Sequence, residues 1–225
     1  MTTTGQTNQS LDAADAVAGD GAVTARLDGL RGLIAKSPRR AADAVWEWFG
    51  ELGARSKNDA AGANAELNTL FRSGQPPRGL DGPTDGMLVT TTINPLVDPA
   101  VRIVTKLWMP WQGKRFDAAR ASGVNRLTQT ASLPSRLLWP LYSMKDASKG
   151  KLAFDFTTCV ETGKEDPDRD VMVIDYSRVE GNPALIIRSI RDELIEIVPG
   201  AHLGKILFHL PSERYERIGF FALRS

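Results

Sequence analysis

Apolar side chains recur every three or four residues between residues 22 and 80, which is the spacing of amphipathic helices. Three such stripes follow one another: Val23, Leu27, Leu30 and Ile34; then Ala41, Val45, Trp48, Phe49 and Leu52; then Ala63, Leu67, Leu70 and Phe71. Ser37 and Pro38 look like an N-cap followed by a first-turn proline. Gly74 and Pro76 end the third stripe. The pattern predicts three helices whose apolar faces are buried against the rest of the chain.

From about residue 86 the pattern changes to short runs rich in Val, Ile, Thr and Phe, bounded by Gly, Pro, Asn and Asp. Strand candidates lie at 87–93, 101–108, 123–130, 151–160, 170–177, 202–210 and 216–223, whereas 184–197 could be strand or helix. Strict alternation predicts that Leu152, Phe154, Phe156 and Thr158 share one face of their strand. Seven or eight short strands with few helices between them indicate an antiparallel sandwich or a closed barrel.

The composition narrows the class of partner. The chain has 225 residues, with 28 basic and 27 acidic side chains and a net charge of +1, so no global field attracts nucleic acid. The single cysteine, Cys159, excludes an internal disulfide framework and a cysteine-rich zinc site. Neither a secretory signal nor an apolar run long enough to span a membrane is visible, so a cytoplasmic protein is expected.

Most catalytic and metal-binding motifs fail on spacing. The two Gly-Lys pairs lack the other positions of a phosphate-binding loop, and no nucleophile elbow occurs. Asp166, Asp168 and Asp170 begin like a calcium loop, but no glycine follows where the loop must turn sharply, so a solvated hairpin is expected. His202 and His209 are seven apart on one predicted strand and so point to opposite faces, which disfavours a two-histidine metal site.

Residues 106–117 read KLWMPWQGKRFD, which places Trp108, Trp111 and Phe116 close to Lys114. Plain core packing is one interpretation, because large aromatic side chains dominate protein cores. The other is a ligand pocket, because Pro110 interrupts strand pairing and lets Trp111 turn into a barrel mouth, whereas Trp108 lies within the alternating strand. A lysine among indoles could bind an acidic head group while the aromatic rings hold an apolar body.

Two further groups of residues extend this expectation. Trp139 and Tyr142 repeat the aromatic theme in SRLLWPLYS. The candidates for acid or base chemistry come from the charged segment 172–197 and are Asp175, Tyr176, Arg188 and Glu193. Such charges are either pairs at the rim or polar groups inside a cavity, and alternation alone does not say which faces of 171–176 and 185–197 point inward.

The stretch Trp111-Gln112-Gly113-Lys114, together with strands ending in IDY, DEL and PGAHLGK, resembles small bacterial proteins of lipocalin or calycin type that carry a G-x-W-x-G motif before a barrel domain. Met109 stands in place of the first glycine of that motif. The resemblance covers roughly residues 66–225 and leaves the helical N-terminus outside. It implies a ligand-holding barrel and transfers no catalytic residue.

The expected fold is therefore mainly β (α+β): an antiparallel, calycin-like β-barrel preceded by N-terminal amphipathic helices. Its expected organisation is a disordered tail at 1–21, a helical segment at 22–80 packed on the barrel, and the barrel domain at 81–225.

The first functional hypothesis is binding of a small, largely apolar ligand, with an acidic head group as one option. The expected ligand-binding residues are Trp108, Trp111, Lys114, Phe116, Trp139, Tyr142, His202 and Lys205. An enzyme of cyclase or isomerase type on the same barrel is the alternative, and a helix-mediated interaction module is the third. No cofactor is demanded by any pattern, although His202 or His209 could ligate haem iron singly, and homo-oligomerisation stays open.

Overall fold

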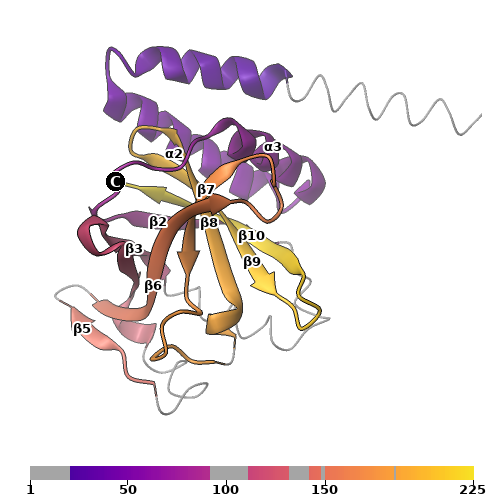
Figure 1. Cartoon of the computed structure of the whole chain (residues 1–225). Helices are drawn as coiled ribbons and strands as arrows, with labels where there is room; N and C mark the ends of the chain where they lie inside the picture. The colour runs from indigo at the N-terminus through magenta and orange to yellow at the C-terminus, as the bar shows by residue number, and fades with distance from the viewer. Residues whose placement is uncertain (1–20, 92–110, 132–141, 148–149, 185) are drawn as a thin grey trace, which may run out of the picture.

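The computed structural model describes residues 21–91, 111–131, 142–147, 150–184 and 186–225 (Figure 1). Several expectations fall outside these residues. They are nearly all of the tail at 1–21, the strand at 101–108, and the aromatic residues Trp108 and Trp139. The described part of the chain is mostly antiparallel sheet in a nearly closed barrel, preceded by helices. The fold class expected from the pattern of apolar residues is thus confirmed.

The helices form where the apolar stripes predict them: residues 21–33 are helical, followed by α2 (Pro38–Arg55) and α3 (Ala60–Ser73). Pro38 occupies the first turn of α2, but the side chain of Ser37 makes no capping hydrogen bond; its carbonyl accepts from the amide of Ala41 at 3.1 Å instead. Asp59 caps α3 by accepting from the amide of Gly62 at 2.8 Å.

The strands are β1 (Gly82–Pro83), β2 (Asp85–Thr91), β3 (Trp111–Asp117), β4 (Ser122–Leu127), β5 (Lys145–Ala147), β6 (Gly150–Thr162), β7 (Asp170–Asp175), β8 (Ile190–Val198), β9 (Ala201–His209) and β10 (Tyr215–Arg224). Their order is β1-β3-β4-β6-β7-β8-β9-β10-β2, and β5 pairs with β6 beside this path. Short 3-10 turns follow β3 (η1, Ala118–Arg120), follow β4 (η2, Gln129–Ala131) and precede β8 (η3, Ile187–Ser189). Within the ambiguous segment 184–197, residues 187–189 form a 3-10 turn and the strand begins at Ile190.

The barrel closes where β1 and β2 follow each other along the chain. β1 pairs with β3 at one end of the strand order, and β2 pairs with β10 at the other. Thr84 joins the two strands and donates its amide to the carbonyl of Lys114 at 2.8 Å. Gly86 and Gly113 meet here: a Cβ on Gly86 would lie 2.5 Å from the Cα of Gly113. The two glycines therefore let two backbones approach at the seam.

Each face of the barrel wall has its own apolar core. The outer face of β2 and β7–β10 packs against the helices, with Trp48, Phe49 and Phe71 buried between the layers. α2 contacts β2, β8, β9 and β10, and α3 contacts β8 and β9 (Figure 1). The inner face holds a second cluster that includes Phe156 and Leu194. The helices thus cover the side of the barrel and leave its interior as a separate compartment.

One strand departs from the alternation that its sequence predicts. Ala153 and Phe154 are both buried although they are adjacent, and Phe154 has a positive φ of 58°. The pairing with β4 shifts at this point, where Asn125 pairs with Ala153 and Val124 pairs with Asp155. Phe154 is therefore the extra residue of a β-bulge, which bends the strand locally and turns this side chain.

Replacement of Gly113 by Ala tests the seam. Gly113 has a φ of 135°, and its Cβ would lie 2.1 Å from the carbonyl oxygen of Thr84. Strain and overpacking together should lower the free energy of unfolding by about 2–5 kcal/mol. Gly50→Ala in α2 is the matched control, since nothing lies within 4 Å of its added Cβ. This control should gain about 0.5–1 kcal/mol from helix propensity. Equal urea midpoints for the two variants would contradict the account of the seam.

Candidate functional site

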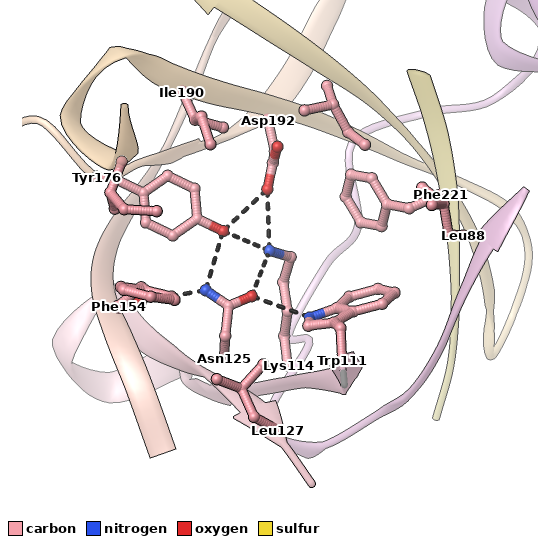
Figure 2. A pocket seen from close by; sticks show the side chains of 12 residues that line it. Leu88, Trp111, Lys114, Asn125, Leu127, Phe154, Tyr176, Ile190, Asp192 and Phe221 are labelled. Atoms are coloured by element: carbon pink, nitrogen blue, oxygen red, sulfur yellow. Dashed lines mark hydrogen bonds and ion pairs between the residues drawn. The ribbon is translucent and has the colours of Figure 1, made fainter. Parts of the chain in front are cut away.

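A cavity of about 40 Å³ occupies the interior of the barrel, and the empty space around it, open mouth and solvent included, is about 500 Å³. Most of its lining is apolar: Leu88, Trp111, Leu127, Phe154, Ile187, Ile190, Ile206 and Phe221. Four polar side chains complete the wall, namely Lys114, Asn125, Tyr176 and Asp192 (Figure 2). Apolar walls with a few converging polar groups are typical of small-molecule sites.

The four polar residues form one hydrogen-bonded network, which we call the interior quartet. The ammonium of Lys114 donates to Asp192 Oδ2 at 2.9 Å, to Asn125 Oδ1 at 3.0 Å and to the hydroxyl of Tyr176 at 2.5 Å. The Tyr176 hydroxyl donates to Asp192 Oδ2 at 3.0 Å and accepts from Asn125 Nδ2 at 3.2 Å. Trp111 joins the edge of the quartet by donating Nε1 to Asn125 Oδ1 at 3.1 Å (Figure 2).

Almost every polar atom of the quartet has a partner. Lys114 has three N–H groups, and all three have acceptors. Asn125 also donates to the carbonyl of Phe154 at 3.2 Å. Among the described residues, Asp192 Oδ1 is the one side-chain oxygen or nitrogen of the quartet that is buried without a hydrogen-bond partner. The quartet is therefore a closed, preorganised unit rather than a set of free groups.

Aromatic rings surround the lysine as well. Its Nζ lies 5.2 Å from the ring centroids of Tyr176 and Phe221, 5.3 Å from that of Phe156 and 5.7 Å from that of Trp111. Each ring face is electron-rich and attracts a cation at this range. Asp192 and the four rings together offset part of the cost of placing a positive charge out of contact with water.

Burial shifts the pKa values of Lys114 and Tyr176. The side chains of Lys114 and Asp192 are only 3% and 4% exposed. Burial lowers the pKa of the Lys114 ammonium below its usual 10.5, although Asp192 opposes that shift. Burial, followed by the charge of Asp192, raises the pKa of the Tyr176 hydroxyl well above 10.0. Tyr176 therefore remains a hydroxyl at neutral pH, and the free amine of Lys114 is more accessible than that of an exposed lysine.

A bulge in β3 places Trp111 and Lys114 in the same cavity. Residues three apart on a regular strand point to opposite faces. The pairing of β3 with β4 shifts between Trp111 and Gly113, so one residue is added and both side chains turn inward. Gly113 supplies the positive φ within this bulge. Tyr176 follows β7, and Asp192 comes from the neighbouring strand β8, where it pairs with Ile174.

The structure brings together only some of the residues expected at a ligand site. Trp111 and Lys114 line the cavity. Tyr142 stacks on Phe154, which lines it, with ring centroids 5.2 Å apart. Phe116 lies away from the cavity, packs against Phe156 and borders a separate hollow beside η1.

Lys205 lies on the other side of the barrel wall, beneath α3. Its ammonium pairs with Asp166 Oδ2 at 2.6 Å and with Glu165 Oε2 at 3.0 Å, and it lies 4.6 Å from the ring centroid of Phe71. Arg72 of α3 pairs with Asp166 and Asp168. The acidic loop that resembles the start of a calcium site is thus held by cations of the chain itself. Lys205 does not reach the cavity, because odd-numbered residues of β9 face the helices.

The four candidates for acid or base chemistry are also divided between the cavity and positions outside it. Tyr176 points into the interior, whereas Asp175 is on the outer face and pairs with Arg178 at 3.1 Å. Glu193 is fully buried on the outer side, where it pairs with Arg191 at 2.9 Å, and burial raises its pKa. Arg188 donates to the carbonyl of Ser177 at 3.3 Å and is outside the cavity lining. Only Tyr176 of the four residues is in the cavity.

Sequence reasoning missed Asn125 and Asp192 as site residues. Asp192 belongs to a charged run in which Glu193 seemed an equal candidate, and Asn125 is a lone amide in a strand. The available signal was alternation: Asp192 and Leu194 lie on one face, and so do Asn125 and Leu127. A polar residue that shares a strand face with buried apolar residues indicates a polar group inside the barrel.

His202 is buried in the wall without a polar partner. It is 1% exposed, and neither ring nitrogen has a hydrogen-bond partner within the described parts of the chain. The nearest carboxylate oxygen, Oε1 of Glu196, is 3.9 Å from Nδ1. Burial lowers the pKa of the imidazole from 6.5 to about 4. His202 does not line the cavity that holds Trp111 and Lys114.

Two searches of the described residues bear on metals and membranes. No group of three or more His, Cys, Asp or Glu side chains is placed to hold a metal ion in the regions that the structure describes. Over the same regions, no helix is both long and apolar enough to cross a bilayer.

Comparison with known proteins adds nothing to the functional argument. No family model matches the chain, and no curated protein matches its sequence. A crystal structure of a protein from Thermomonospora curvata is similar in part, with 14% sequence identity and a TM-score of 0.41. The similarity covers 77% of this chain and 97% of the other. The functional argument therefore rests on the residues of the site.

A double-mutant cycle tests the coupling within the quartet. Lys114→Met or Asp192→Leu alone leaves a buried charge without its partner and should lower the free energy of unfolding by about 3–5 kcal/mol. The double variant removes both charges and should be less destabilised than either single variant. Urea unfolding of all four proteins provides the measurement. Losses that simply add would show that the two charges are not coupled.

The pH dependence of stability tests the burial of His202. Its pKa of about 4 in the folded state lies below the 6.5 of the free side chain, so the unfolded state binds the proton first. As the pH falls from 6.5 to 4, the wild type should therefore lose about 1.4 kcal/mol per pH unit relative to His202→Leu. Urea unfolding at several pH values measures this difference, and parallel profiles for the two proteins would contradict it.

Proposed function

We propose that this protein binds a small, largely apolar molecule inside its barrel. The observation that carries the proposal is the interior cavity, in which eight apolar side chains surround one polar network. Burial of apolar ligand surface supplies the main driving force, and the polar network fixes orientation. The resemblance to lipocalin-type barrels supports the same function.

The polar end of the ligand is better matched by an uncharged group than by an acid. The expectation of an acidic head group depended on a lysine with a free charge. The charge of Lys114 is instead balanced by Asp192 at 2.9 Å, and its three N–H groups are all engaged. A carboxylate entering the cavity would also meet Asp192 as a second negative charge. A carbonyl or hydroxyl group avoids that repulsion.

Acid or base catalysis is the second candidate function. Tyr176 and Asp192 lie 3.0 Å apart on the cavity wall, which is a geometry for moving a proton to or from a bound molecule. An isomerase or cyclase would use the same cavity, so turnover of a bound ligand is what separates the two functions. The third hypothesis, docking through the helices, is less favoured, because Trp48 and Phe49 are 1% and 0% exposed against the barrel.

Replacement of Trp111 by Ala tests the binding function. Trp111 lines the cavity and touches Phe221 edge-on, with ring centroids 5.8 Å apart. Its loss removes one wall, so the affinity for a neutral naphthylamine dye should fall roughly tenfold or more, equivalent to at least about 1.4 kcal/mol of contact. Fluorescence titration of the dye gives the affinity, and urea unfolding gives the folded fraction.

Trp46→Ala is the matched control for this variant. Trp46 is a half-buried tryptophan of α2 on the helical side of the barrel, where Arg224 lies 4.9 Å from its ring centroid. Its replacement should leave the dye affinity unchanged. If Trp111→Ala loses stability but keeps full affinity per folded molecule, the stretch around Trp111 is ordinary core packing.

A further inference from the structure

The cavity wall carries one primary amine, and its position is unusual for a lysine. Among the described residues that line the cavity, Lys114 is the only lysine. Its side chain is 3% exposed, so the amine can be reached from the cavity rather than from bulk solvent. A buried ion pair at this place is costly compared with apolar side chains of similar size. Stability alone therefore does not explain a lysine at this position, and we look for a chemical role of its amine.

Other lysines differ from Lys114 in their surroundings. Lys205 is equally buried, but it is locked between Asp166 and Glu165 on the helical side of the barrel wall. Lys145 is 67% exposed and pairs with Asp155 at the surface. Of these three lysines, only Lys114 combines an apolar cavity, a single carboxylate and a hydroxyl within hydrogen-bond distance.

We propose that Lys114 is a covalent attachment site for an apolar aldehyde or ketone, with which its amine forms an imine inside the barrel. This inference rests on the proposed function, because the carbonyl compound must first bind in the cavity. An uncharged carbonyl end brings no second negative charge next to Asp192.

The neighbours of Lys114 supply each proton that imine formation requires. The ammonium first passes a proton to Asp192, whose Oδ2 is 2.9 Å away. The nitrogen lone pair then attacks the carbonyl carbon, the C=O π electrons move to oxygen, and that oxygen takes up a proton while the nitrogen loses one. The hydroxyl of this carbinolamine leaves as water on receiving a further proton, and the C=N bond forms. Amine and carbonyl thus give imine and water, with no oxidant or reductant.

Tyr176 and Asp192 form the relay for these transfers. The Tyr176 hydroxyl is 2.5 Å from the amine and 3.0 Å from Asp192 Oδ2, so a proton can pass between carboxylate and nitrogen through it. Burial lowers the pKa of Lys114, which favours the free amine that the attack requires.

The surroundings also stabilise the product. A protonated imine keeps the positive charge at the same nitrogen, next to Asp192 and among the same four rings. The bonds from Asn125 to Tyr176 and from Tyr176 to Asp192 do not involve Lys114 and survive its reaction. The apolar lining limits access of the water that would reverse the reaction.

Reductive trapping on the full chain tests this inference. The protein is incubated with limiting hydrocinnamaldehyde and cyanoborohydride, whose hydride converts an imine into a stable secondary amine. Intact mass then gives the number of adducts, and peptide mapping gives their positions. We expect one saturable adduct at Lys114, in roughly tenfold excess over Lys145, because binding raises the effective concentration of the carbonyl group. Adducts spread over exposed lysines, with Lys114 unmodified, would overturn the inference.

The alcohol analogue distinguishes failure of this inference from failure of the binding function. Hydrocinnamyl alcohol cannot form an imine, but it is close to the aldehyde in size and shape, so it should displace the naphthylamine dye and suppress labelling of Lys114. If alcohol and aldehyde both displace the dye while Lys114 stays unlabelled, the imine is wrong and the binding function stands. If neither the alcohol nor the aldehyde displaces the dye and Lys114 is unlabelled, both the imine and the binding function are wrong for this ligand class.

Two variants serve as additional controls for the labelling experiment. Lys114→Met should abolish the adduct, and Lys145→Arg should leave labelling at Lys114 unchanged because its side chain is exposed at the surface. The mapping in the wild-type chain decides the outcome even if Lys114→Met fails to fold.

Discussion

Two opposite charges, the ammonium of Lys114 and the carboxylate of Asp192, lie 2.9 Å apart inside an apolar barrel and set the conditions for everything around them. Each charge loses its hydration on folding, and the pair survives only because other groups complete its coordination. Asn125, Tyr176 and four aromatic rings do so from several different strands. The barrel must therefore close in a single register, because a slip of one residue would turn one charge outward and leave the other unpaired.

A buried lysine–aspartate pair occurs on each face of the barrel wall, and the two pairs have different surroundings. Lys205 and Asp166 form a buried pair on the outer side, and Arg72 ties that pair to α3. This outer network connects the helical layer to the loop between β6 and β7, and none of its three residues lines the interior cavity. The inner pair faces a cavity. What distinguishes a candidate site from a structural ion pair is thus the open space next to it, and residue type or burial alone does not reveal it.

The sequence predicts the layers of this fold better than it predicts the site. Helical spacing of apolar residues gives α2 and α3, and alternation gives most strands, because both patterns are local. The interior quartet depends on bulges at Gly113 and Phe154, which change the facing of single residues and leave only a weak trace in the sequence. Trp111 and Lys114 could be proposed as neighbours in the chain, but their partner Asp192 lies 78 residues beyond Lys114. Pairing across that separation is set by strand order, which one sequence does not specify.

The most direct test of this account is the titration of the Lys114 amine itself. Lysine labelled with ¹³C at Cε gives one NMR signal per side chain, and Lys114→Arg assigns the signal of interest. Desolvation inside the barrel predicts that this signal titrates below the usual 10.5 of a lysine ammonium. If the Lys114 signal titrates at 10.5 or above, the amine does not have the desolvated surroundings that the interior quartet gives it, and the account is contradicted.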